Sequence, residues 1–319
     1  MDSMRWNAKE GNYYLKFYTS AYLILTIFSA TLRILKQSKI LMNKIYSRFS
    51  YLLLLIYFFL LNSCTNNNIT SDDSLKKYFD QYHVTGTFGL YDNGHAQFTI
   101  YDIHRFADSA YLPASTFKIV NSLIGLQTGV IANEKMVIPW DGVVRADTNW
   151  NKDLTMEQAF KLSAVPYYQE VARRIGKDTM QHWLDSIGYA AKNGRAVIHD
   201  DLDAFWLDNN FKITADEQLG LVEKLYFDQL PFQKRVQDVV KKVMLQEDNS
   251  NYKLSYKTGW GFKEDGTSIG WIVGWEEENL HPYFFVLQIE GPHDMDMKNI
   301  RIDILKNILT QYGFFKGIK

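Results

Sequence analysis

Cysteine is almost absent from this chain, and its histidines do not cluster. The 319 residues include a single cysteine, Cys64, so no internal disulfide can form. The seven histidines are scattered, and none pairs with another at the spacing typical of zinc ligands. The composition therefore indicates neither a disulfide framework nor a zinc site, and we expect no bound metal.

The chain also lacks an excess of charge of either sign. Lys and Arg number 35 against 36 Asp and Glu, a formal net charge of −1. It has no basic block with interleaved aromatic residues and no internal repeats. Because nucleic-acid binding needs a basic patch, the sequence predicts no nucleic-acid partner. It leaves the oligomeric state open.

Long apolar runs are scarce too, and the one unbroken run lies near the N-terminus. Residues 51–61 follow Lys44 and Arg48 and lead into Asn62, Ser63 and Cys64. A basic start, an apolar run and small residues before a cysteine resemble a bacterial lipoprotein signal peptide. The sequence therefore predicts a signal peptide over 42–64, a lipidation candidate at Cys64, and a periplasmic protein whose membrane contact is a lipid anchor.

Two alternatives stay open for this region. The cysteine would be incidental in an ordinary signal sequence. A second apolar patch at 22–28 would make 1–61 two membrane segments. Translation could start at Met42. The sequence leaves open whether the upstream extension 1–41 is part of the translated protein. Residues 65–74 are polar and read as a flexible tether, and 75–319 suits one enzyme domain.

Hydrophobic periodicity in 75–319 predicts an α/β (α+β) fold. Two strands flank an Asp92-Asn93-Gly94 turn that suits a hairpin, and three further strands come late in the chain. We expect these strands to form one antiparallel sheet, with the helical middle of the chain as a second lobe. The predicted strands are 85–91, 97–101, 253–262, 268–275 and 283–289, and the predicted helices are 75–82, 155–162, 167–175, 179–187, 215–226, 234–244 and 298–311.

The most informative motif is Ser115 followed three residues later by Lys118. On a helix these side chains share one face. A serine needs a neighbouring base to become a nucleophile, and burial can strip a lysine of its charge. An apolar segment follows, so we expect Ser115 at the N-terminus of a buried helix, where free N–H groups favour an oxyanion. Alternatively, the stretch is a plain core helix that Ser115 merely begins.

Two further motifs follow in order. Ser163-Ala164-Val165 precedes a predicted helix, and Lys257-Thr258-Gly259 lies in a predicted strand. A second serine could relay a proton and a second lysine could attract an anionic substrate. A glycine in a strand often admits a close ligand backbone. In isolation, a turn serine and an exposed strand lysine would be the simpler interpretations.

Ser-x-x-Lys, Ser-x-Val and Lys-Thr-Gly in this order are the signature of the serine penicillin-recognising enzymes. Over about residues 75 to 317 the chain resembles the class D β-lactamases, the oxacillinases. The strings that carry the resemblance are 111–119 (YLPASTFKI), 121–126 (NSLIGL), 161–176 (KLSAVPYYQEVARRIG), 205–207 (FWL), 256–261 (YKTGWG) and 270–275 (GWIVGW).

The resemblance implies a β-lactamase/transpeptidase-like fold: an antiparallel sheet of five to seven strands flanked by terminal helices, plus a helical lobe, with the site between them. It implies that Ser115 forms an acyl-enzyme with a β-lactam. It implies that Lys118 is N6-carboxylated by carbon dioxide and acts as general base. No other cofactor is implied. Trp206 matches the tryptophan that bonds the modified lysine, although core packing would be its plain interpretation.

The remaining roles also come from the resemblance. Ser163 would pass a proton to the lactam nitrogen and Lys257 would bias the potential. Thr258 and Arg301 would bind the substrate carboxylate, although Arg301 could equally be an exposed helix charge. The backbone N–H groups of Ser115 and Trp260 would form an oxyanion hole. Val165 would form an apolar wall of the site, and Phe117 is a second candidate for that wall.

One family motif is altered. An aromatic-Gly-Asn triplet is expected after the Ser-x-Val helix, but Tyr189 is followed by Ala190 and Ala191, and an Asn193-Gly194 turn comes later. This leaves one wall of the site, and the substrate range, undetermined.

The sequence thus predicts a hydrolase that destroys penicillins and confers resistance. Two alternatives acylate without turnover: a β-lactam sensor domain and a transpeptidase. Whether carbapenems or oxyimino-cephalosporins are substrates is left open.

Overall fold

The computed structural model describes residues 68–319 apart from 193, 195 and 200. The predicted signal peptide 42–64 with Cys64, the upstream extension 1–41 and Asn193 of the altered motif lie outside the described residues. Among the helices that are described, none combines the length and the apolar character needed to cross a membrane.

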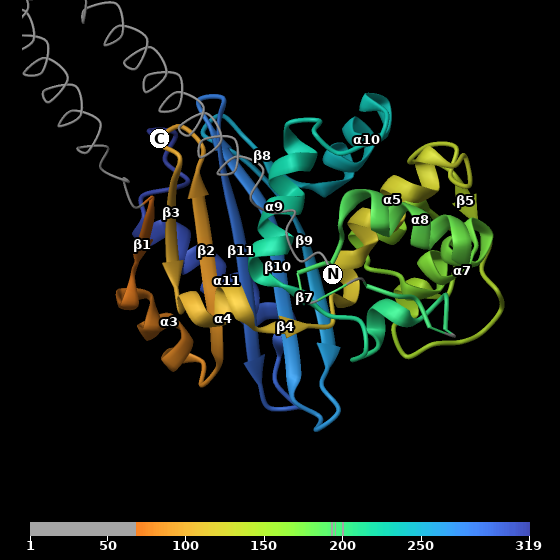
Figure 1. Cartoon of the computed structure of the whole chain (residues 1–319), viewed down its shortest axis with the longest axis horizontal. Coiled ribbons are helices and arrows are strands. Elements are labelled where there is room, and N and C mark those ends of the chain that lie inside the picture. The colour runs from red at the N-terminus through yellow and green to blue at the C-terminus, as the bar shows by residue number, and fades with distance from the viewer. Residues whose placement is uncertain (1–67, 193, 195, 200) are drawn as a thin grey trace, which may run out of the picture. The chain divides into compact units, whose positions relative to one another are not determined.

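A seven-stranded sheet runs through the described domain, in the order β1-β3-β2-β11-β10-β9-β8 (Figure 1). All neighbours are antiparallel except the edge pair β1 and β3, which is parallel. The strands are β1 (Ile69–Ser71), β2 (Thr85–Asp92), β3 (Gln97–Tyr101), β8 (Leu245–Asp248), β9 (Lys253–Phe262), β10 (Ser268–Glu278) and β11 (His281–Gly291).

The two faces of the sheet contribute to two separate cores. On β10, Trp271 and Val273 point into the larger core with the helical lobe, whereas Ile272 points into the smaller one. This alternation is the period of a strand. Because β10 and β11 are covered on both faces, they read as nearly continuous apolar runs.

Helices cover both faces, and a helical lobe lies beside the sheet. Helices α3 and α11 pack on the smaller core, and α4 and α9 on the larger one. The lobe with α5, α7 and α8 lies beside the β9 side of the sheet in Figure 1. The α-helices are α3 (Lys76–Gln81), α4 (Ile103–Asp108), α5 (Lys118–Gln127), α6 (Met156–Lys161), α7 (Val165–Ile175), α8 (Lys177–Ile187), α9 (Ala215–Tyr226), α10 (Lys234–Met244) and α11 (Met297–Gln311).

Short elements complete the fold. Two small two-stranded sheets pair β4 (Ala110–Tyr111) with β7 (Ile213–Thr214) and β5 (Val137–Ile138) with β6 (Leu154–Thr155). The 3₁₀ turns are η1 (Asp73–Leu75), η2 (Ala114–Phe117), η3 (Thr148–Trp150) and η4 (Phe205–Leu207).

The predicted architecture is confirmed, and most elements agree within two residues. Helices α9 and α10 and strand β3 have the predicted bounds. Strands β1 and β8, helix α4 and the short strand pairs were not predicted. The five predicted strands pair antiparallel as predicted, and the unpredicted β1 adds a parallel edge beside β3.

The prediction of a flexible tether over 65–74 is wrong for its second half. Ile69–Ser71 forms β1, and Asp73–Leu75 forms a 3₁₀ turn that the Asp72 side chain caps. The amide of Phe98 donates to the carbonyl oxygen of Asn68 at 2.7 Å. Backbone pairing with β3 orders this polar segment, because the pairing needs no apolar side chains.

Candidate active site

The Ser-x-x-Lys motif bridges two kinds of helix. Ser115 lies in the 3₁₀ turn η2, which follows Pro113, and Lys118 is the first residue of α5. The prediction of Ser115 at an α-helical N-terminus is therefore corrected to a 3₁₀ turn that runs directly into the helix. The Lys118 Nζ atom donates a hydrogen bond to Ser115 Oγ at 2.8 Å, so the two side chains meet as the spacing predicts.

Lys118 is fully buried, with 0% of its surface exposed. Burial lowers the pKa of its amine from 10.5 to about 7, because an ammonium group loses its hydration in the interior. Its Nζ atom lies 5.5 Å from the centre of the Tyr168 ring, and the Tyr168 hydroxyl bonds Ser122 at 2.8 Å. A sizeable fraction of Lys118 is therefore an uncharged amine at neutral pH.

Trp206 packs against Phe117, in the segment that joins Ser115 to Lys118, and its indole N–H group has no acceptor among the described residues. Its ring stacks on Phe117 with centroids 5.2 Å apart and an angle of 19°. It is fully buried, and its Nε1 atom makes no hydrogen bond within the described part of the chain. Buried indole N–H groups normally find an acceptor, so this site can take an additional one. Phe117 itself is fully buried, so it packs behind the nucleophile and forms no exposed wall.

The second and third motifs meet each other across the sheet and the helical lobe. Lys257, on β9, donates from Nζ to Ser163 Oγ and, at 2.9 Å, to the carbonyl oxygen of Thr258. The pKa of Lys257 lies well below its ordinary value because of burial and because of the nearby charges of Lys118 and Arg301. Ser163 has a φ of 53°, a conformation that is rare for residues other than glycine and that concentrates at functional sites.

Gly259 is required by the chain itself. A Cβ atom at this position would meet the Pro113 carbonyl oxygen at 3.0 Å and Thr116 Cγ2 at 3.1 Å. One at Gly261 would meet Leu112 Cδ1 at 2.7 Å. The two glycines therefore let β9 lie directly against the segment that carries Ser115. The prediction that Gly259 makes room for a ligand backbone is corrected accordingly.

The other predicted binding residues flank this contact. Arg301, only 6% exposed, donates from its guanidinium to the Gly259 carbonyl oxygen, and burial lowers its pKa to about 10. The open interpretation of Arg301 as an exposed helix charge is therefore wrong. Trp260 is 44% exposed, with its indole N–H bonded to Ser268 at 2.8 Å. Thr258 and Val165 are partly exposed, with Val165 opening α7.

Two residues that fix the nucleophile segment were not predicted from the sequence. Gln218 on α9 is fully buried and donates to Thr116 Oγ1 at 2.6 Å. The indole N–H of Trp271 on β10 donates to the Leu112 carbonyl oxygen at 3.0 Å. A buried polar residue among apolar neighbours on a helix was the only sequence signal for Gln218.

An ion-pair network also escaped prediction. The Glu290 carboxylate on β11 binds the Arg105 guanidinium and, at 2.7 Å, the Lys263 amine. Arg105 also donates to the Tyr111 hydroxyl at 2.7 Å. Tyr111 precedes the nucleophile turn, and Lys263 opens the β9–β10 connection. Glu290 thereby ties these two segments together.

Tyr189 of the altered aromatic motif lies in the core. Tyr189 is 4% exposed, and its ring lies 5.6 Å from that of Phe117 and 5.9 Å from that of Phe211. It supports the nucleophile turn from the interior. The effect of the altered motif on a site wall stays a prediction, because Asn193 lies outside the described residues.

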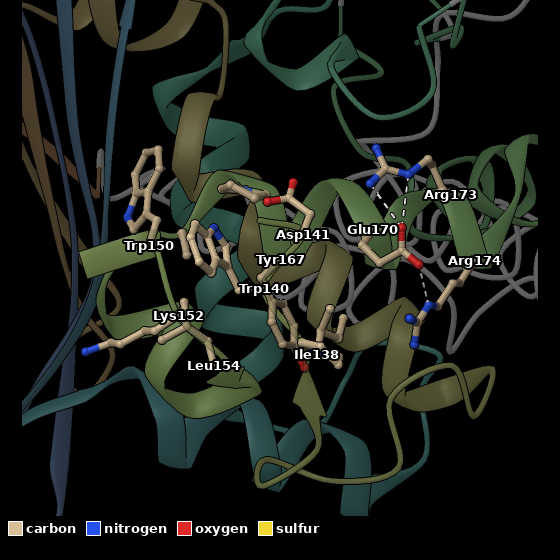
Figure 2. A pocket seen from close by; sticks show the side chains of 13 residues that line it. Ile138, Trp140, Asp141, Trp150, Lys152, Leu154, Tyr167, Glu170, Arg173 and Arg174 are labelled. Atoms are coloured by element: carbon tan, nitrogen blue, oxygen red, sulfur yellow. Dashed lines mark hydrogen bonds and ion pairs between the residues drawn. The ribbon is translucent and has the colours of Figure 1, made fainter. Parts of the chain in front are cut away.

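A separate pocket of about 140 Å³ lies between residues 138–154 and α7 (Figure 2). Trp140, Trp150 and Tyr167 contribute aromatic rings, and Ala164 and Pro166 place the pocket beside the Ser163 turn. Ser115, Lys118 and Lys257 do not line it. It therefore adjoins the second motif without containing the chemistry.

The buried amine predicts an unusual pH dependence of stability. Between pH 7 and its ordinary pKa of 10.5, folded Lys118 binds fewer protons than the unfolded chain, so stability rises with pH there. Lys118→Met removes this term. We expect the free energy of unfolding of the variant to exceed that of the wild type at about pH 6. At about pH 9 this difference should be smaller. Urea unfolding in degassed buffer measures this, with exposed Lys212→Met as control. A difference that does not vary with pH would contradict a buried ammonium at low pH.

Glu290→Gln should loosen two segments at once. Loss of the charge leaves Arg105 and Lys263 without their shared carboxylate, at a cost of roughly 1–3 kcal/mol. We expect faster amide hydrogen exchange both in 263–267 and in 105–111. The matched control is Glu247→Gln, because Glu247 also binds a lysine and a tyrosine, Lys306 and Tyr252. Faster exchange in only one segment would show that Glu290 does not couple them.

Comparisons with known proteins agree with this arrangement. Residues 67–310 match the family model of the penicillin binding protein transpeptidase domain. Beta-lactamase OXA-48 from Klebsiella pneumoniae is 38% identical over 238 residues, which are 75% of this chain and 87% of that protein.

Solved structures show the same fold. FUS-1 (OXA-85), a class D β-lactamase from Fusobacterium nucleatum subsp. polymorphum, has a TM-score of 0.72 and 32% identity, covering 78% of this chain and 100% of that one. The C-terminal domain of the Bacillus licheniformis BlaR penicillin-receptor also has a TM-score of 0.72, at 27% identity, covering 77% and 97%. The predicted resemblance and the predicted fold class are confirmed: the chain belongs to the class D β-lactamases, a family of hydrolases.

Proposed function

We propose that this protein hydrolyses the β-lactam ring of penicillins and related antibiotics through an acyl-enzyme on Ser115, and so confers resistance. The proposal is supported by membership of the class D β-lactamases and by the meeting of all three motifs at one place. The observation that carries it is the fully buried Lys118 amine, 2.8 Å from Ser115 Oγ. A buried amine with a pKa near 7 beside a serine hydroxyl can act as the base of a nucleophile–base pair.

Lys118 is proposed to act as an N6-carboxylysine. A neutral amine adds to carbon dioxide: the nitrogen forms a bond to carbon, and one N–H proton leaves to solvent. The resulting carbamate is an anion that can accept hydrogen bonds. The unpartnered Trp206 N–H, donor only, fits such a group. No metal or other cofactor enters the proposal.

In the acylation step, carboxylated Lys118 takes the proton of Ser115 Oγ, which attacks the lactam carbonyl carbon. The backbone N–H groups of Ser115 and Trp260 would stabilise the oxyanion, worth about 3 kcal/mol per donor. The carbon–nitrogen bond then breaks, and Ser163 passes a proton to the leaving nitrogen. Lys257 donates to Ser163 and can replace that proton.

Substrate binding and deacylation use the surrounding residues. Thr258 and Arg301 would bind the substrate carboxylate, since a guanidinium matches a carboxylate through two bonds. Val165 would contact the substrate as an apolar wall. Carboxylated Lys118 would first lose to solvent the proton taken from Ser115. It would then take a proton from the water that attacks the ester carbon, and this proton would pass to Ser115 Oγ as the product acid leaves.

The alternative is a sensor that acylates without turnover. The likeness to the BlaR penicillin-receptor domain favours keeping this candidate. The two functions differ in the lifetime of the acyl-enzyme, which is short in a hydrolase and long in a receptor.

Intact mass spectrometry with a penicillin tests the proposal directly. We expect a transient adduct on Ser115, complete hydrolysis of excess antibiotic and no adduct with Ser115→Ala. A stable adduct without turnover, under saturating bicarbonate, would instead establish the receptor function.

Trp206→Phe tests the carbamate. Removing the indole N–H removes a hydrogen bond to the carboxylated lysine, so the variant should need roughly tenfold more bicarbonate for half-maximal hydrolysis, a change of about 1.4 kcal/mol. Activity should recover at high bicarbonate. Trp183→Phe is the control, because Trp183 stacks on Phe232 in another part of the lobe. An unchanged bicarbonate requirement in Trp206→Phe would contradict a hydrogen bond from Trp206 to the carboxylated Lys118.

For location, we propose secretion by the 42–64 signal peptide, lipidation at Cys64 and a periplasmic, membrane-anchored protein. The order of basic, apolar and small residues before Cys64 supports it. The mass of the protein purified from membranes measures both the removal of the signal peptide and the lipid on Cys64, and Cys64→Ser should release the protein into the soluble fraction.

A further inference from the structure

Several chain segments meet at one end of the sheet, which we call the turn end. Here β1 begins, β2 turns into β3, and β10 turns into β11. The Gly94 amide, in the β2–β3 turn, donates to the His281 ring at 3.1 Å, which joins the two turns. Gln97, at the start of β3, donates to Thr70 Oγ1 at 3.0 Å. The start of the described domain is thus tied to these turns.

The last described residues are held against the same end. The backbone amides of Ile318 and Lys319 donate to the Glu278 carboxylate at 2.8 and 3.0 Å. The Asn279 side chain donates to the Gly317 and Lys319 carbonyl oxygens at 3.2 and 2.9 Å. The segment 317–319 therefore has a defined place beside the β10–β11 turn.

The turn end exposes apolar side chains to solvent. Leu280, in the β10–β11 turn, is 87% exposed, and Ile318 beside it is 73% exposed. Ile69, the first residue of β1, is 38% exposed. Three strand spacings, roughly 15 Å, separate β1 from β11, so these residues span the width of a surface. Leu280 and Ile318 form a neighbouring pair of exposed apolar side chains, and such exposed apolar surface can mark an interaction site.

Exposed cations accompany these apolar residues. Lys253 begins β9 at this end, opposite Glu277 of β10. Lys316 and Lys319 lie in the last described segment, and all three lysines are exposed. Apolar side chains mixed with lysines are typical of surfaces that rest in the interface of a lipid bilayer.

Chain length limits where this surface can be. Asn68 is fixed to β3 by its hydrogen bond with Phe98, so at most four peptide steps separate Cys64 from the turn end. Four steps span at most about 14 Å. A diacylglyceryl group on Cys64 would hold the turn end within that distance of the bilayer.

We propose that the turn end docks on the phospholipid bilayer, with Leu280 and Ile318 in the interface. The proposal rests on lipidation of Cys64 and is independent of the chemistry at Ser115. Strand β9 leads away from this end, from Lys253 to Phe262. At about 3.3 Å per residue, Lys257 lies roughly 13 Å and Trp260 roughly 23 Å along it. Docking thus holds the site away from the lipid and open to soluble substrates.

Single cysteines labelled with an environment-sensitive fluorophore test the docking. A lipidated Cys64 has no free thiol, so Leu280→Cys or Ile318→Cys in the full chain is labelled alone. In membranes that carry the protein, we expect nonpolar emission at both positions, quenched by nitroxide lipids. Val144→Cys, 79% exposed in the helical lobe, is the matched control and should report water. Emission at 280 and 318 equal to that at 144 would overturn the proposal.

Further arms separate the alternatives. Nonpolar emission without quenching by nitroxide lipids would mean a protein neighbour, such as a second copy, and would also overturn it. Cys64→Ser should return both positions to aqueous emission. A protein without lipid on Cys64 would also overturn the proposal, because docking rests on that anchor. Penicillin hydrolysis measured on the same samples shows whether the proposed activity holds regardless of docking.

Discussion

The burial of the Lys118 amine beside the Ser115 hydroxyl is the constraint on which the rest of this structure depends. The Lys118 side chain is 0% exposed, so its ammonium form loses its hydration. The pKa of the amine therefore falls to about 7. The apolar helix α5, the Phe117–Trp206 stack and the Tyr168 ring form the enclosure that produces this shift. The same enclosure leaves the Trp206 N–H without a partner among the described residues, which is what an additional acceptor on Lys118 would require.

The sheet acts as the template that brings the remaining groups to this pair. Strand β9 carries Lys257, and it can lie against the nucleophile turn only because positions 259 and 261 have no side chain. Trp271 and Gln218 hold the turn from β10 and α9. Glu290 joins the segment before the turn to the β9–β10 connection. The site is therefore positioned by backbone contacts and buried polar bonds from distant parts of the chain.

The two ends of the sheet have different surroundings. One end gathers the chain entry, the last described residues and exposed Leu280, whereas the Lys-Thr-Gly motif lies further along β9. A pocket lined by Ala164 and Pro166 (Figure 2) adjoins the turn of Ser163, whose side chain accepts from Lys257. The proposed membrane docking would use this separation, because it would leave the motif open to substrate from solution.

The sequence predicts best those elements whose form depends on neighbouring residues in the chain. Helices α9 and α10 have the predicted bounds because periodic apolar residues specify a helix wherever it packs. The sequence predicts a tether where β1 forms, because this three-residue segment has no periodic apolar pattern and becomes a strand only by pairing with β3. The network around Glu290 could not be predicted, since its members are far apart in sequence.

By itself the sequence determined the three motifs, the nucleophile–base pair and the family, because residue identity and short spacing encode them. Only the tertiary structure decided that Lys118 is buried enough for its pKa to fall to about 7, that Gly259 serves the packing of β9, and that the last described residues lie beside the β10–β11 turn. Burial and contact belong to the assembled fold, in which segments up to 240 residues apart become neighbours.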